Sequence, residues 1–185
     1  MKKSRAVLLS LMIGAGAISP VHADSFFTDA FSLERKKEIA PVTSEAYRKG
    51  CGECHFLYQP GLLPEQSWRK LLDAKALEDH FGENAELSDK DRIAILEFLV
   101  ANSAEKSNYK RSKKIMASLQ PGEAPLRIIE VPYIKRKHNE IPEDLIKKND
   151  KVKSLSYCDK CHQQADKNSF DDDAVNIPGH GNWTW

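Results

Sequence analysis

Two short motifs hold the residues of this sequence that are best suited to chemistry. They read Cys51-Gly52-Glu53-Cys54-His55 and Cys158-Asp159-Lys160-Cys161-His162. Cys-x-x-Cys-His is the signature of covalent c-type haem attachment. The two thiols can reach the two vinyl groups on one edge of a porphyrin, and the next residue on a helical turn then places its imidazole on the iron. The motifs predict two covalently bound haem c groups, with the four cysteines in the thioether bonds and His55 and His162 as iron ligands.

Zinc binding, a redox dithiol and a disulfide are the rival interpretations of each cysteine pair. None of them requires histidine at the next position. Histidine makes up 6 of 185 residues, so chance would place it after both pairs roughly once in a thousand sequences. The separation between Cys54 and Cys158 also far exceeds the usual spacing within a zinc module.

Each iron needs a second axial ligand, which in cytochromes c is methionine or histidine. Beyond the motifs and the N-terminal segment 1–23, the candidates are His80, Met116, His138 and His180. His80 follows His55 near the end of a predicted helix that can return over the first haem. We therefore expect His80 to bind the first iron. The alternative is a solvated histidine at a helix end.

The second iron has two candidate ligands. His138 ends a basic run and precedes His162 by a loop long enough to wrap one haem, whereas His180 follows His162 in a tail rich in glycine and proline. The apolar stretch from Ile128 to Ile134 can hold His138 beside a porphyrin, while the glycines around His180 make fixing it costly in backbone entropy. We expect His138 to be the ligand, with His180 as the alternative and Met116 packed in the core.

The N-terminal segment 1–23 has the features of a secretory signal peptide. A basic start precedes a short apolar run, and Val21-His22-Ala23 resembles a cleavage site. Cleavage after Ala23 removes three of the 28 basic side chains, which leaves 25 against 27 acidic ones and a formal charge of −2. The sequence thus predicts an exported protein, and it has no basic excess that would favour nucleic-acid binding.

The remaining chain is predicted to be mainly α-helical, with two small haem-binding halves. We place the first haem domain at residues 24–103 and the second at 104–185. The first half is expected to resemble a class-I cytochrome c. Its helices are predicted from Ser44 to Cys51, from Pro64 to a stop at Gly82, and from Ser88 with Ile93, Leu96, Leu99 and Val100 buried. The second half is expected to be loop-rich and wrapped around its haem. It has a β-like segment at 126–131 that ends at Pro132, a short helix from Pro142, and a last helix from Ser156 to Ala165.

Several further segments carry a family resemblance, and each is short. They are Trp68, His80-Phe81-Gly82, Pro125-Leu126-Arg127-Ile128, Pro132-Tyr133, Arg136-Lys137-His138, Ala165-Asp166 and Ile177-Pro178. With the two motifs, they make the sequence from about Ser44 to Pro178 resemble the dihaem cytochrome c family.

The resemblance implies a periplasmic electron carrier with two low-spin, bis-histidine haems. By position, His80 would bind the first iron and His138 the second. It also implies electron donation to a small monohaem cytochrome that can bind oxygen. The chain extends past the family's usual end, and this extension contains His180.

Electron transfer without catalysis is therefore the function that we expect. The alternative is a small dihaem peroxidase or reductase with one open iron, which requires that either His80 or His138 does not bind. A subunit docked to a membrane-bound electron donor is a third interpretation.

Overall fold

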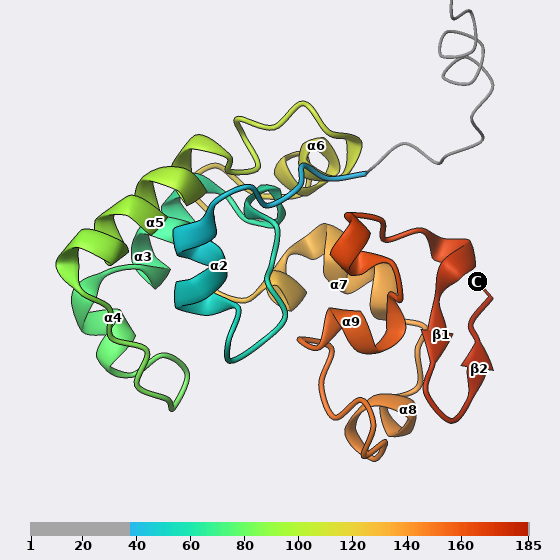
Figure 1. Ribbon diagram of the computed structural model, residues 1–185. Coiled ribbons are helices and arrows are strands. Elements are labelled where there is room, and N and C mark those ends of the chain that lie inside the picture. The colour runs from blue at the N-terminus through green and yellow to red at the C-terminus, as the bar shows by residue number, and fades with distance from the viewer. Residues whose placement is uncertain (1–37, 185) are drawn as a thin grey trace, which may run out of the picture. The chain divides into compact units, whose positions relative to one another are not determined.

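A computed structural model describes residues 38–184, and these residues are mainly helical (Figure 1). They lie within one compact unit, residues 36–185. The helices and strands in the described part are α2 (Glu45–Cys51), α3 (Glu65–Leu71), α4 (Ala74–Glu78), α5 (Asp89–Ala101), α6 (Lys110–Met116), α7 (Pro132–His138), α8 (Glu143–Lys147), α9 (Cys158–Cys161), β1 (Asn176–Ile177) and β2 (Gly181–Asn182). Short 3₁₀ turns at Pro60–Leu62, Ile128–Glu130, Ala165–Lys167 and Asp172–Ala174 connect them.

Helices α2 and α5 begin where the sequence predicts. Ser44 caps α2, since its hydroxyl accepts a hydrogen bond from the Tyr47 amide at 3.2 Å. Ser88 caps α5 by accepting from the Asp91 amide at 3.1 Å, and its hydroxyl donates to the Asp91 carboxylate at 2.6 Å. Such caps satisfy amides that have no partner within the helix. As Figure 1 shows, α5 packs with α2 and α3.

Two details of this first half differ from the prediction. The expected helix from Pro64 to the stop at Gly82 is two helices, α3 and α4, because the Asp73 carboxylate caps a new start by accepting from two amides of α4. On α5 the fully buried side chains are Ile95 and Leu99, whereas Ile93 is 48 % exposed. The prediction that Ile93 belongs to the buried face is wrong.

In the part of the second half that precedes the second motif, the chain contains more helix and less strand than expected. Residues 128–130 form a 3₁₀ turn, and Pro132 begins α7 instead of ending a strand. Proline fits this position because the first helical amide needs no partner within the helix. The expected helix from Ser156 to Ala165 shrinks to α9, since His162 pairs as an isolated bridge with Val175. The tail forms a small antiparallel hairpin of β1 and β2.

One apolar core joins segments that are far apart in the sequence. It includes Ile39, Leu99, Val131 and Phe170, while a smaller cluster around Ile146, Val152 and Ile177 packs near the hairpin. The buried Gln59 amide donates to the Ala165 carbonyl at 2.8 Å and to the Asn168 side chain at 3.3 Å. Hydrogen bonds thus cross between the predicted haem domains 24–103 and 104–185, whose boundary stays a prediction.

The predicted signal peptide, residues 1–23, lies outside the described residues. Within the described range, 38–184, no helix is long and apolar enough to cross a bilayer.

Candidate haem-binding sites

The first motif lies at the end of α2. Cys51 is the last residue of this helix and is half-buried, while Cys54 is exposed in the turn that follows. Burial, together with the neighbouring Cys54, raises the pKa of the Cys51 thiol to about 11. This thiol is therefore protonated at neutral pH in the absence of haem.

His55 presents one ring nitrogen for a ligand. Its Nδ1 lies 2.7 Å from the carbonyl oxygen of Phe56. Because a carbonyl can only accept, Nδ1 carries the proton and donates, which leaves the lone pair on Nε2. Metal-binding histidines commonly have their second nitrogen fixed in this way.

A strained turn holds His80. The His80 amide donates to the Glu83 carbonyl at 2.7 Å, and both central residues have positive φ, with 61° at Phe81 and 102° at Gly82. Glycine adopts this conformation readily, whereas phenylalanine does so at a cost in free energy. The Arg127 guanidinium lies 3.9 Å from the centre of the Phe81 ring and packs on it.

His80 belongs to the environment of the first motif. Burial lowers the pKa of its imidazole, and the nearby His55 and Arg127 lower it further. The ring is therefore held in the neutral form, which can bind a metal. Beside it, Phe81 is 46 % exposed and offers an apolar surface to a planar group.

The second motif spans α9 and the residue after it. Cys158 and Cys161 are the first and last residues of this helix, and His162 follows as its C-cap. Burial is the main cause that raises the pKa of the Cys158 thiol to about 12. As in the first motif, all described cysteines are free thiols without disulfides.

His138 and His162 face each other across a gap. Their ring centroids lie 6.0 Å apart, and the ring planes are inclined by 72°. With metal–nitrogen bonds of about 2 Å, the centroids of two imidazoles on opposite sides of one metal ion lie roughly 6 Å apart. The His138 Nδ1 donates to the Ile134 carbonyl at 2.8 Å, so Nε2 has the lone pair. The two rings are spaced as two ligands of one iron would be.

Both rings of this pair are held neutral. Burial lowers the pKa of His162 to about 4, and the nearby His138 and Arg111 contribute to that shift. Burial also lowers the pKa of His138, and this effect outweighs the hydrogen bond to the Ile134 carbonyl, which raises it. Among the described residues, the buried Nδ1 of His162 has no hydrogen-bond partner. A buried polar atom without a partner is rare in proteins and is consistent with a ligand-binding site.

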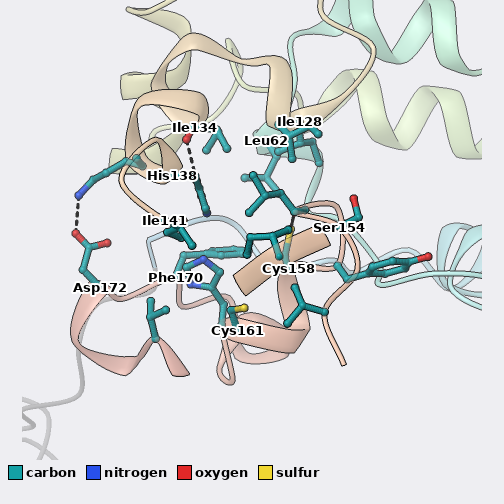
Figure 2. Close-up of a pocket in the computed structure, with 18 of the residues that line it drawn as sticks. Leu62, Ile128, Ile134, His138, Ile141, Ser154, Cys158, Cys161, Phe170 and Asp172 are labelled. Atoms are coloured by element: carbon teal, nitrogen blue, oxygen red, sulfur yellow. Dashed lines mark hydrogen bonds and ion pairs between the residues drawn. The ribbon is translucent and has the colours of Figure 1, made fainter. Parts of the chain in front are cut away.

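An apolar hollow, partly open to solvent, surrounds this pair. Figure 2 shows His138 and the two cysteines among its walls, with aliphatic side chains around them. At its rim, the Lys137 ammonium lies 2.6 Å from the Asp172 carboxylate. Because the hollow is apolar and is flanked by both thiols and both imidazoles, its residues fit a covalently bound haem.

The other two candidate ligands lie elsewhere. His180 is exposed in the turn between β1 and β2, next to Trp183, and does not line the hollow. Met116 packs partly buried against the main core, as expected. The structure therefore brings His138, and not His180, to the second motif.

Sequence reasoning missed several residues around the second site. Phe170 packs edge-on against His162, with ring centroids 5.3 Å apart. The buried Arg111 also lines the hollow, donates to the Phe170 carbonyl at 2.9 Å and pairs with Glu38. Arg111 lies within a lysine-rich stretch whose composition predicts a solvent-exposed boundary between the two halves. The sequence therefore contains no sign that this side chain is buried at the second site.

A bare metal ion fits the described residues less well than haem. No three His, Cys, Asp or Glu side chains of residues 38–184 cluster as ligands of an ion would. At the second motif, two thiols and one histidine instead lie beside a second, distant histidine. The porphyrin of a haem supplies the other four iron ligands. The protein therefore needs to provide only two axial ligands and the two thiols that attach the haem.

Comparisons with known proteins agree with this geometry. Residues 47–170 match the family model described as dihaem cytochrome c. A diheme cytochrome c from Shewanella baltica OS155 is 37 % identical with a TM-score of 0.62, and the match covers 76 % of this chain and 97 % of that one. A diheme cytochrome c from Rhodobacter sphaeroides is 37 % identical with a TM-score of 0.61, covering 70 % and 98 %. The comparison with curated proteins gave no match.

The family match spans most of the described residues and includes both motifs. The chain belongs to the dihaem cytochrome c family, whose members carry electrons on two covalently bound haem c groups.

Proposed function

We propose that this protein is a periplasmic electron carrier in which two histidines bind each iron. His55 and His80 would hold the first haem, and His138 and His162 the second. The cysteines of each motif would form its thioether bonds. The observation that carries this proposal is the facing pair of neutral imidazoles at 6.0 Å.

The protein's own residues would set the redox behaviour. Each haem iron, when bound, cycles between ferric and ferrous states by exchanging one electron. Two histidine ligands give lower potentials than a histidine–methionine pair. The backbone carbonyls of Phe56 and Ile134 orient the rings of His55 and His138. The apolar walls of the hollow would limit water around a haem bound there.

The two predicted halves would act as one electron-transfer unit. The first would hold its haem against α2 and the His80 turn, in the manner of a class-I cytochrome c. The second would wrap its haem with α7, α9 and the hairpin. The lining of the hollow supports this, since it draws on segments from Leu62 to Val175.

A small soluble monohaem cytochrome is the electron acceptor that we propose. The family resemblance supports this choice. Because the formal charge after cleavage is only −2, docking would depend on local charged patches of the surface and not on the net charge. A membrane-bound donor is the proposed source of electrons. We propose no catalytic site, because an enzyme of the peroxidase or reductase class needs an iron with an open position.

Stopped-flow mixing tests this function. The fully reduced protein should rapidly reduce an oxidised small monohaem cytochrome, with two electrons delivered per chain. In a parallel experiment, the reduced protein should consume peroxide slowly, because no iron position is open to it. Fast peroxide turnover without electron delivery to the cytochrome would contradict the proposal.

A further inference from the structure

Tyr58 touches both haem-binding segments of the chain. We propose that Tyr58 is a positioning residue that couples the two haem sites and provides a route for electrons between them. This inference rests on the proposed function, because it requires that both haems exchange electrons within one molecule.

The ring of Tyr58 lies against the first site. Its centroid is 5.1 Å from that of His55, and the two ring planes are inclined by 35°. Phe56 packs edge-on against the same tyrosine, with centroids 5.6 Å apart. Because the Phe56 carbonyl also accepts from His55 Nδ1, ring packing and a hydrogen bond together fix the imidazole.

The hydroxyl of Tyr58 reaches the second motif. It donates to the carbonyl oxygen of Ser156 at 2.6 Å, across 98 positions of sequence. Ser156 lies two residues before Cys158, and the Cys158 sulfur is 3.8 Å from the same carbonyl oxygen. One side chain therefore links the first motif's histidine to the attachment cysteine of the second haem.

The main chain around Tyr58 is itself anchored. The Tyr47 hydroxyl donates to the Tyr58 carbonyl at 2.9 Å. The Tyr58 ring also packs against His55 and Phe56. These contacts give the side chain little freedom to leave the gap between the two motifs.

The transfer along this route moves one electron and no proton. An electron leaves the ferrous iron of one haem and reduces the ferric iron of the other. The Tyr58 hydroxyl keeps its proton, because it donates to the Ser156 carbonyl. The tyrosine is neither oxidised nor reduced. Electron tunnelling falls off more slowly through bonds and hydrogen bonds than through empty gaps, so the Tyr58 contacts favour transfer.

Gln59 offers a matched comparison. It also joins the two motif-bearing segments through buried hydrogen bonds, but neither of those bonds reaches a motif histidine or cysteine. If Tyr58 only fastened the segments together, loss of the Gln59 bonds would have the same consequence as loss of the tyrosine hydroxyl. Tyr58→Phe, Tyr58→Leu and Gln59→Leu separate a fastening role from an electron route.

The experiment uses the half-reduced holoprotein with both haems attached. Haem methyl resonances in the nuclear magnetic resonance spectrum differ between ferric and ferrous haem, and their exchange broadening gives the rate of electron exchange. Measurements over a dilution series isolate the exchange within one molecule. In Tyr58→Phe this rate should fall severalfold, in Tyr58→Leu it should fall further, and in Gln59→Leu it should stay at the wild-type value while thermal stability drops.

The exchange rates of these variants distinguish an electron route through Tyr58 from a purely structural role. A wild-type rate in Tyr58→Phe would overturn the route through the hydroxyl, whatever Tyr58→Leu shows. An equal slowing in Gln59→Leu would reduce Tyr58 to a fastening role. If the wild-type protein shows no exchange within the molecule, the proposed function as a single electron-transfer unit fails instead.

Discussion

At the scale of residues, each proposed iron site pairs a motif histidine with a histidine from a distant segment. The second pair is the more buried of the two, and its rings face each other. Both imidazoles are held neutral by desolvation, so their lone pairs are available to a metal at neutral pH. The ligand choice at the second haem therefore depends on the position of His138 at the end of α7.

Replacing His138 tests this choice most simply. We expect His138→Ala to keep the second haem attached but to leave its iron high-spin and open to added imidazole. His138→Met should instead raise the potential of this haem, because a thioether is a weaker donor. Absorption spectra and a redox titration measure both changes.

The control is His180→Ala. Because His180 is exposed in the hairpin turn, its loss should leave both haem spectra unchanged. An open iron in His180→Ala, together with an unaltered spectrum in His138→Ala, would reverse the assignment.

Acid should release the second iron's ligands only well below neutral pH. Neutral imidazole binds iron and protonated imidazole does not. Burial and its neighbours lower the pKa of His162 to about 4, from an ordinary value of about 6.5, and iron binding lowers it further. The stabilisation from this ligand is thus fully present above the ordinary pKa of about 6.5, and it is lost progressively as the pH falls from there through about 4. An acid titration of the oxidised protein, followed by absorption, should show a low-spin second haem at pH 5. Conversion to high-spin iron near pH 6 would contradict this.

At the scale of elements, local sequence signals predict the helix starts well. Ser44 and Ser88 cap α2 and α5 because a cap depends only on neighbouring residues. The tail from Ile177 is rich in glycine and proline, which predicts that it lacks helix, and it forms the hairpin.

The elements that differ from prediction depend on distant contacts. The apolar run at 126–131 has the composition of a strand, but no partner strand pairs with it within the described residues, and Pro132 starts α7. The last helix stops at Cys161 because His162 pairs with Val175 from the tail. Likewise, Arg111 belongs to a stretch of solvated composition, yet Glu38 and Phe170 pack around it. The motif residues could be predicted from spacing, whereas the walls of the haem site required the fold.

The hairpin should stabilise the second site without supplying a ligand. The Trp183 amide donates to the Val175 carbonyl at 3.0 Å, and its side chain packs against the small cluster of Ile146, Val152 and Ile177. Truncation after Pro178 should therefore keep both haems low-spin but lower the free energy of unfolding by roughly 2 kcal/mol, from the lost apolar packing. Denaturant titration, with a chain truncated after Trp183 as control, measures this difference. Loss of low-spin signal in the shorter chain at neutral pH would show that the hairpin supplies more than packing.

At the scale of the whole molecule, the two haem-binding segments share a core and several buried hydrogen bonds. Gln59, Tyr58 and Arg111 each join residues that are far apart in the sequence. Such connections hold two redox sites in a fixed relation, which suits a carrier that accepts and delivers electrons through the same molecule. Within the described residues the protein is thus built as one unit.

Electron paramagnetic resonance of the fully oxidised protein at low temperature tests the central claim most directly. That claim is that both irons are six-coordinate with two histidine ligands each, which makes the protein a carrier of electrons. Two low-spin ferric signals of the bis-histidine type should appear, in equal amounts and together accounting for two irons per chain. A high-spin ferric signal amounting to one iron per chain at neutral pH would contradict it and would favour a redox enzyme with an open site.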